Sequence, residues 1–414
     1  MRKQTAIQPR PLFGKATPAG GPSTVDVEAN QVDEVVTSYL AAFPSEIDVA
    51  GDHAIAAEFV KRYSHNASTL RTYRIFVERL LLWSWIIRGK SILQLSLQDA
   101  EDFIRFNKAP ALDWIGPTTS RRFVVAGSDM AFNDAWRPFS EQKSEAAGVY
   151  TVQRTTLELI ISTCHAFYEH VADMGHAVRN PFSIKQRSRL TGQKPQQRRS
   201  KSLTQLEWDY LLDVAREMAD SNPKYERSLF IVVALFSMYL RIGDLAGSDT
   251  WQPTMGSFFK RKNCWWFAAC GKGGVQAEIS VKPDFLEYLK RYRESRNLSP
   301  LPASGENTPL LTTNSGRPGL SARQIRSLVQ EVFDQAIQKM LSEGRSQDEC
   351  DQLKSATVHW LRHTGATFDA EFRPVKHLQM DLRHASLQTT TDIYYNSIDE
   401  ERAASNSGLG IRRG

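Results

Sequence analysis

Six residues in the second half of the chain have side chains that together could act on a phosphodiester. In chain order they are Arg241, Lys272, His359, Arg362, His384 and Tyr394. The planar guanidinium group matches the oxygens of a phosphate, and histidine exchanges protons near neutral pH. A tyrosine with its ordinary pKa of about 10 attacks a phosphodiester only if cations stabilise the developing charge and a base accepts its proton. The set contains a nucleophile, cations and proton carriers, which is what that chemistry needs.

Arg241 directly follows a predicted helix over residues 225–239, whose second half is almost wholly apolar. A charge at the end of a buried helix is costly unless a partner neutralises it. Asp244, three residues later, is one possible partner, and a bound phosphate is another. For Arg241 taken alone, an ion pair with Asp244 is the simpler interpretation.

Lys272 lies in the glycine-rich run 271–274, between strand-like runs over 264–270 and 275–281. This pattern predicts a β-hairpin with the lysine at its turn. The run is not a P-loop. That motif has a glycine at the position of Trp266, and a serine or threonine directly after the lysine, where this chain has Gly273. The lysine either reaches into a groove or is simply solvated.

His359 and Arg362 are three residues apart, so on a helix they share one face. A nearby arginine disfavours protonation of an imidazole, which suits proton exchange near neutral pH. His384 taken alone is interpreted as a surface or capping histidine, and Tyr394 alone as a packing residue. Tyr395 is the next residue, so either tyrosine is a candidate nucleophile.

The elements that must position these residues are mainly helical. In the first half we expect helices from Ser68–Thr69 to Trp85, ended by Gly89, and over residues 97–107 and 152–174. Residues 1 to about 30 have the composition of a disordered arm, followed by a short helix over 32–43. The weakly patterned residues 110–150 are interpreted as an irregular or shorter helical insertion, in which residues 118–122 either contact phosphates or form a surface turn.

The second half has further helical periodicity over 205–218, 225–239, 285–295 and 321–341, and again after Thr357. Between the halves, residues 183–203 carry seven cations and no acidic residue. The seven are Lys185, Arg187, Arg189, Lys194, Arg198, Arg199 and Lys201. The segment is either a solvated linker or a linker that lies along a phosphate backbone, where each cation displaces counterions.

Composition narrows the class of protein. The chain has 414 residues, a net charge of +6 and a pI near 9.0, which suits a polyanionic partner without proving one. No uncharged apolar run reaches the length of a membrane span, and the N-terminus lacks the apolar core of a secretory signal. The four cysteines have no CxxC spacing, so we expect free thiols and no zinc site. We therefore expect a soluble, cytoplasmic protein without cofactor or metal.

The order and surroundings of the six residues resemble those of the tyrosine recombinase, or phage integrase, family. The matching text is LRIGDL around Arg241, GKGG around Lys272, HWLRHTGAT from His359 and HASLQTTTDIY from His384. The resemblance covers residues 200–400 well and the first half less well. It implies a flexible arm (1–50), a helical core-binding domain (51–182), a basic linker (183–202) and a catalytic domain (203–414), which together clamp DNA as a mainly α fold with a small antiparallel sheet.

The resemblance also implies a role for each residue. Arg241 and Arg362 would bind the scissile phosphate, Lys272 would protonate the departing 5′ oxygen, His359 would act as general acid and base, His384 would hydrogen-bond the phosphate, and Tyr394 would form a 3′-phosphotyrosyl link. That link conserves the bond energy, so no ATP or metal is needed. The implied partners are double-stranded recombination sites, a homotetramer on DNA, and accessory DNA-bending or directionality proteins. The long segment 110–150 and the N-terminal arm favour an integrase of a mobile element.

The chain departs from the family pattern at three places. Arg383 stands where the family usually has glycine, which would add charge near the phosphate or point to solvent. Trp360 replaces a common aspartate, and the gap from His384 to the tyrosine is one residue longer than usual. The Ile-Tyr pair after the threonine run still favours Tyr394. The alternatives are a type IB topoisomerase-like enzyme with the same chemistry and a DNA-binding regulator with none.

Overall fold

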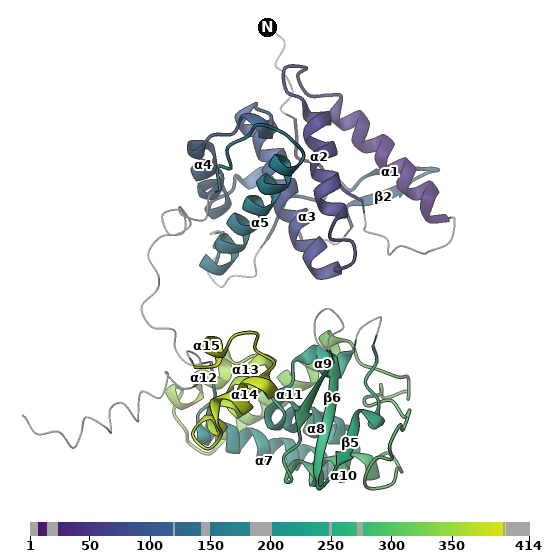
Figure 1. The fold of residues 1–414 in the computed structure, drawn as a ribbon, viewed down its shortest axis with the longest axis vertical. Coiled ribbons are helices and arrows are strands. Elements are labelled where there is room, and N and C mark those ends of the chain that lie inside the picture. The colour runs from purple at the N-terminus through teal and green to yellow at the C-terminus, as the bar shows by residue number, and fades with distance from the viewer. Residues whose placement is uncertain are drawn as a thin grey trace, which may run out of the picture. The chain divides into compact units, whose positions relative to one another are not determined.

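A computed structural model describes residues 7–14, 24–118, 121–141, 150–182, 201–247, 251–270, 276–391 and 394, with only the backbone described for 24–30. The chain divides into two compact units between Gln196 and Gln197, inside the basic segment (Figure 1). Each unit has its own hydrophobic core. Within the described ranges no helix combines the length and the apolar character needed to cross a membrane.

Unit 1 is a helical body with short strands (purple to teal in Figure 1). Its helices are α1 (Thr24–Leu40), α2 (Val49–Lys61), α3 (Ala67–Leu82), α4 (Leu97–Lys108) and α5 (Arg154–Asp173). Helix α3 begins two residues earlier than a Ser68 cap implies, because Asn66 is the N-cap and its Oδ1 accepts the Thr69 N–H at 3.1 Å. The chain then continues as a short π-helix (Trp83–Arg88) to Gly89, whose φ of +62° ends the helix as predicted. The predicted helices over 97–107 and 152–174 are confirmed.

The described residues before position 50 differ from the expected flexible arm. Helix α1 begins at Thr24 and contributes Val36 and Leu40 to the core. Leu12 is only 2% exposed, and its N–H donates to Glu78 Oε1 at 2.7 Å. The Pro- and Gly-rich composition concealed these few apolar side chains, which are sufficient to pack the described parts of the segment onto unit 1.

Residues 110–150 contain short strands, where an irregular or shorter helical insertion was expected. Strand β1 (Ile115–Gly116) pairs in parallel with β4 (Phe139–Ser140), and β2 (Phe123–Ala126) pairs antiparallel with β3 (Asp129–Phe132). The β2–β3 turn uses Gly127, whose φ is +68°. Strands this short show too little alternation for a periodicity search to detect them.

Arg122, in the same segment, faces inward. Its side chain is 10% exposed, forms an ion pair with the buried Glu78 and donates to Phe13 O at 2.9 Å. The suggested phosphate contact is therefore wrong for Arg122, whose charge is used to neutralise a buried carboxylate. Thr119 and Ser120 lie outside the described residues.

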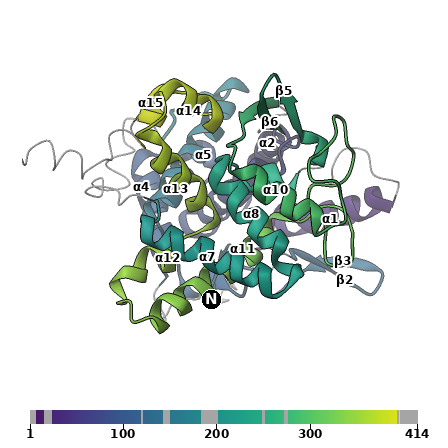
Figure 2. The ribbon, with the colours of Figure 1, turned by 90° about the horizontal axis from the view of Figure 1, so that it is seen from below.

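Unit 2 contains most of the candidate site (teal to yellow in Figure 1). Its helices are α7 (Gln205–Ser221), α8 (Glu226–Ser237), α9 (Ile242–Ala246), α10 (Phe285–Glu294), α11 (Ala322–Ser342), α12 (Asp351–Ser355), α13 (Val358–Ala370), α14 (Val375–Leu382) and α15 (Leu387–Thr390). The apolar helix α8 lies in the middle, in contact with α7, α10, α11 and α13 (Figure 2). The predicted long helices of this half are therefore confirmed.

The sheet of unit 2 is antiparallel, in the order β5–β6–β7. Strands β6 (Cys264–Cys270) and β7 (Gln276–Ser280) match the predicted hairpin, while β5 (Phe258–Arg261) was not predicted. Register pairs Phe267 with Ile279 on one side and with Phe258 on the other, and all three side chains are buried. The turn between β6 and β7, residues 271–275, lies outside the described residues.

Helix α13 packs very closely on α8. A Cβ added at Gly365 would lie 2.1 Å from the carbonyl oxygen of Phe236, so only glycine allows this approach. On the same helix, Thr364 Oγ1 accepts the Leu203 N–H at 2.9 Å, which attaches the start of unit 2 to α13. The helix that carries His359 and Arg362 is therefore held firmly in place.

Candidate active site

Five of the six predicted residues come together in unit 2. Arg241 precedes α9, His359 and Arg362 lie on α13, His384 follows α14, and Tyr394 lies beyond α15. Arg362 Nη2 is 3.4 Å from His384 Nε2, and the rings of His384 and Tyr394 are stacked at 6.2 Å. The sixth residue, Lys272, lies outside the described residues, as does Tyr395.

Arg362 is held by main-chain oxygens. It is 1% exposed, and its guanidinium donates to the carbonyl oxygens of Tyr239 and Leu382. Burial and then the neighbouring charge of Arg241 lower the pKa of Arg362 to about 9. Because two carbonyls are weaker acceptors than a carboxylate, the guanidinium keeps the capacity to bind an anion.

The side chain of Arg241 also contacts the carbonyl oxygen of Leu382. Its Nη2 donates to Leu382 O at 3.3 Å and lies 3.5 Å from Arg383 O. Its main-chain N–H donates to Asp244 Oδ2 at 2.6 Å, but among the described residues its guanidinium forms no ion pair. The expected ion pair between Arg241 and Asp244 is therefore wrong, and both arginine side chains converge on Leu382 O.

Asp244 is instead paired with Arg383. Arg383 Nη1 donates to Asp244 Oδ1 at 2.8 Å and Nη2 to Oδ2, with the two side chains 10% and 3% exposed. The backbone of Arg383 has a φ of +54°, in the left-handed region that glycine adopts most easily. The Arg383 side chain thus forms an ion pair with a carboxylate, and it neither points to solvent nor adds an unpaired charge for binding a phosphate.

Both predicted histidines are in environments that disfavour their charged form. Burial, followed by the charges of Arg362 and Arg241, lowers the pKa of His359. The same causes lower the pKa of His384 to about 4, and its Nδ1 lies 3.0 Å from Thr390 Oγ1. The sequence argument that an arginine on the same face keeps His359 neutral agrees in direction, although burial is the larger cause.

Tyr394 points into the protein and is completely buried. Burial raises the pKa of its hydroxyl to about 12, and the charges of Arg362 and Arg241 oppose that increase. Its Oη lies 2.9 Å from Nδ1 of His363, a residue not among those predicted. The sequence did contain a clue, since His363 follows His359 by four residues and so lies on the same helical face.

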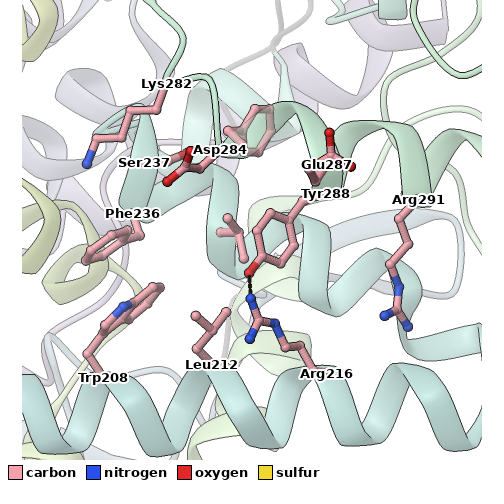
Figure 3. Close-up of a pocket in the computed structure, with 12 residues that line it drawn as sticks. Trp208, Leu212, Arg216, Phe236, Ser237, Lys282, Asp284, Glu287, Tyr288 and Arg291 are labelled. Atoms are coloured by element: carbon pink, nitrogen blue, oxygen red, sulfur yellow. Dashed lines mark hydrogen bonds between the residues drawn. The ribbon is translucent and has the colours of Figure 1, made fainter.

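No described group of three or more His, Cys, Asp or Glu residues has an arrangement that could hold a metal ion. A separate pocket of about 620 Å³ lies among α7, α8 and α10, and the residues lining it include none of the site (Figure 3). Trp208 and Phe236 stack in its wall at 3.7 Å, and Arg216 donates to the Tyr288 hydroxyl. Its cations have partners within the chain, so it offers a ligand mainly aromatic and aliphatic walls.

No protein-family model matches the sequence, and no curated protein matches it. Solved structures are similar across most of the chain. The XerH site-specific recombinase in a post-cleavage complex with a palindromic difH substrate has a TM-score of 0.56 at 13% identity, covering 96% of this chain and 99% of XerH. XerH in a pre-cleavage complex with its difH substrate has a TM-score of 0.53 at 14% identity, covering 96% of this chain and 91% of XerH.

The Tn1549 transposon integrase in complex with circular intermediate DNA has a TM-score of 0.52 at 16% identity, covering 85% of this chain and 98% of that one. The chain therefore has the fold of the tyrosine recombinases, mainly helical with small sheets. At these identities the similarity concerns the fold, and the chemistry must be argued from the site itself.

Proposed function

We propose that this protein is a site-specific DNA recombinase that cleaves and rejoins strands through a covalent link to Tyr394. The observation that carries the proposal is the convergence of Arg241 and Arg362 on one carbonyl, Leu382 O, beside a buried tyrosine and neutral histidines. Neither guanidinium group has a carboxylate partner among the described residues, and a bound phosphodiester would supply that counter-charge.

In the proposed reaction Oη of Tyr394 attacks phosphorus, a bond to the 3′-phosphate forms, and the bond to the 5′ oxygen breaks. Arg241 and Arg362 stabilise the charge on the non-bridging oxygens, and His384, 3.4 Å from Arg362, hydrogen-bonds the same phosphate. His359, as general base, accepts the proton that Tyr394 Oη loses, and Lys272 donates a proton to the leaving 5′ oxygen. Reversal by another 5′ hydroxyl rejoins the strands.

The proposed substrate is double-stranded DNA bearing recombination sites of a mobile element, bound by a homotetramer. The similar solved structures include recombinase and integrase complexes with DNA, which supports this substrate class. We also propose that residues 51–182 bind DNA together with the catalytic domain 203–414. The cations of the linker, residues 183–202, would contact the phosphate backbone of the DNA. A type IB topoisomerase-like activity would use the same site without exchanging partners.

The test is covalent trapping on a nicked suicide substrate built from the bound DNA sequence, which footprinting would identify first. We expect wild type and Tyr395→Phe to form a protein–DNA adduct that survives denaturation, and Tyr394→Phe to form none. Absence of an adduct from wild type with DNA it binds would reduce the protein to a DNA-binding regulator. An adduct from Tyr394→Phe but not from Tyr395→Phe would identify Tyr395 as the nucleophile.

Exchange is tested separately from cleavage. Two duplexes of different length that carry the site are mixed with the protein, and recombinant lengths are expected. Relaxation of supercoiled DNA without any recombinant product would favour the topoisomerase-like alternative.

A further inference from the structure

The hydroxyl of Tyr394 lies against a side chain to which the proposed reaction assigns no role. Nδ1 of His363 is 2.9 Å from Tyr394 Oη, and the two rings are 5.7 Å apart. The His363 ring also lies edge-on to His359 at 4.5 Å. Among the described residues, His363 is therefore the side chain that hydrogen-bonds the attacking atom.

The direction of this hydrogen bond depends on the protonation states of both groups and on the tautomer of His363. Burial, and then the neighbouring His359 and Arg362, lower the pKa of His363 to about 3. The imidazole is neutral at pH 7, so it has one N–H and one lone pair. The hydroxyl of Tyr394, whose pKa is raised to about 12, keeps its proton, and Nδ1 is the hydrogen-bond partner that it has among the described residues; the tautomer in which the hydroxyl donates to Nδ1 gives this buried O–H an acceptor. The proton of His363 is then on Nε2.

The turn of helix that carries His363 is unusually well fixed. Thr364, the next residue, accepts the Leu203 N–H at 2.9 Å, and Gly365 packs directly against Phe236 O of α8. A hydrogen-bond acceptor on so rigid a support can define where the hydroxyl points. Orientation of a nucleophile is worth much in rate, because reaction needs both a short distance and an aligned lone pair.

We propose that His363 is the positioning residue of the nucleophile: its Nδ1 accepts the hydrogen bond of the Tyr394 hydroxyl and directs that oxygen toward the phosphate held by Arg241 and Arg362. The inference rests on the proposed function and deepens it. It separates His363, which orients the nucleophile, from His359, to which proton exchange is assigned. It requires an acceptor at the position of Nδ1 and not merely a side chain of similar size.

Three substitutions test this requirement. In His363→Asn the amide oxygen takes approximately the place of Nδ1, in His363→Gln it lies one bond further out, and in His363→Leu there is no acceptor. We expect His363→Leu to reduce the single-turnover cleavage rate about 100-fold, as a misplaced reacting group does, without changing the affinity for DNA. We expect His363→Asn to recover most of that rate and His363→Gln to recover little.

A second measurement needs no DNA and so separates this inference from the proposed function. In wild type, ¹⁵N NMR of the imidazole rings should show His363 neutral with its proton on Nε2, and Tyr394→Phe should shift its Nδ1 resonance. If the shift is present but wild type forms no adduct, the positioning contact stands and the recombinase proposal fails. The positioning role is overturned if Tyr394→Phe leaves Nδ1 unchanged, if His363→Leu cleaves at the wild-type rate, or if His363→Asn is as slow as His363→Leu.

Discussion

Arg383 combines an unfavourable backbone conformation with a favourable ion pair, and replacing it with glycine separates the two effects. The left-handed conformation at φ +54° costs a non-glycine residue about 1–2 kcal/mol, which Arg383→Gly would recover. The same change removes one partner of a pair whose side chains are 10% and 3% exposed, which costs about 3–5 kcal/mol because Asp244 is left buried and unpaired. The ion pair is the larger effect, so Arg383→Gly should destabilise unit 2 by about 1–4 kcal/mol.

The change should also affect the site. In wild type the Asp244 carboxylate forms an ion pair with Arg383 and also accepts the main-chain N–H of Arg241 at 2.6 Å. Once Arg383 is removed, that carboxylate becomes available to the guanidinium of Arg241 and competes with the phosphate. We therefore expect Arg383→Gly to lower adduct formation at a temperature where it is still folded. The double variant Arg383→Gly/Asp244→Asn should regain both stability and cleavage, because it leaves no unpaired charge.

The assay is calorimetric unfolding of the full chain, which resolves the transition of unit 2, combined with adduct formation on the suicide substrate. Arg383→Ala is the matched control: it loses the same ion pair but keeps the left-handed strain, so it should be about 1 kcal/mol less stable than the glycine variant. An Arg383→Gly protein more stable than wild type would refute the ranking of the two effects. A double variant no better than Arg383→Gly would show that the Asp244 charge does not act on the site.

Two further predictions concern buried charge. The pKa of His384 is lowered to about 4 in the folded protein, from an unfolded value of about 6.5. Between these two pH values the unfolded chain binds more protons, so the free energy of unfolding should fall as the pH drops from 6.5 toward 4. Chemical denaturation at pH 7 and at pH 5 should therefore show a smaller loss of stability for His384→Gln than for wild type. In unit 1, Arg122→Ala should cost about 3–5 kcal/mol because it leaves Glu78 buried and unpaired, and Arg122→Ala/Glu78→Gln should recover part of it. A loss of DNA affinity by Arg122→Ala with unchanged melting would contradict that interpretation.

Local patterns in the sequence were sufficient for the main features of the fold. The helical periodicity of α5, α7, α10 and α11 is strong because each buries one face, and Gly89 ends its helix through its own conformational freedom. The types and order of Arg241, His359, Arg362, His384 and Tyr394 also led to the proposed chemistry, because few reactions need that set of side chains together. Each helical signal lies within a few turns of one segment, whereas the set of site residues was identified from residue types and order between positions 241 and 394.

Partner choice was decided only by the tertiary structure. Asp244 is three residues from Arg241, yet its carboxylate pairs with Arg383, 139 positions away, and Arg241 shares Leu382 O, 141 positions away, with Arg362. Likewise, Arg122 neutralises Glu78, and His363 rather than His359 contacts Tyr394. A sequence shows which charges are present and which of them share a helical face. Which of them meet depends on how α8, α13 and α14 pack, and that is set by close contacts such as Gly365 against Phe236.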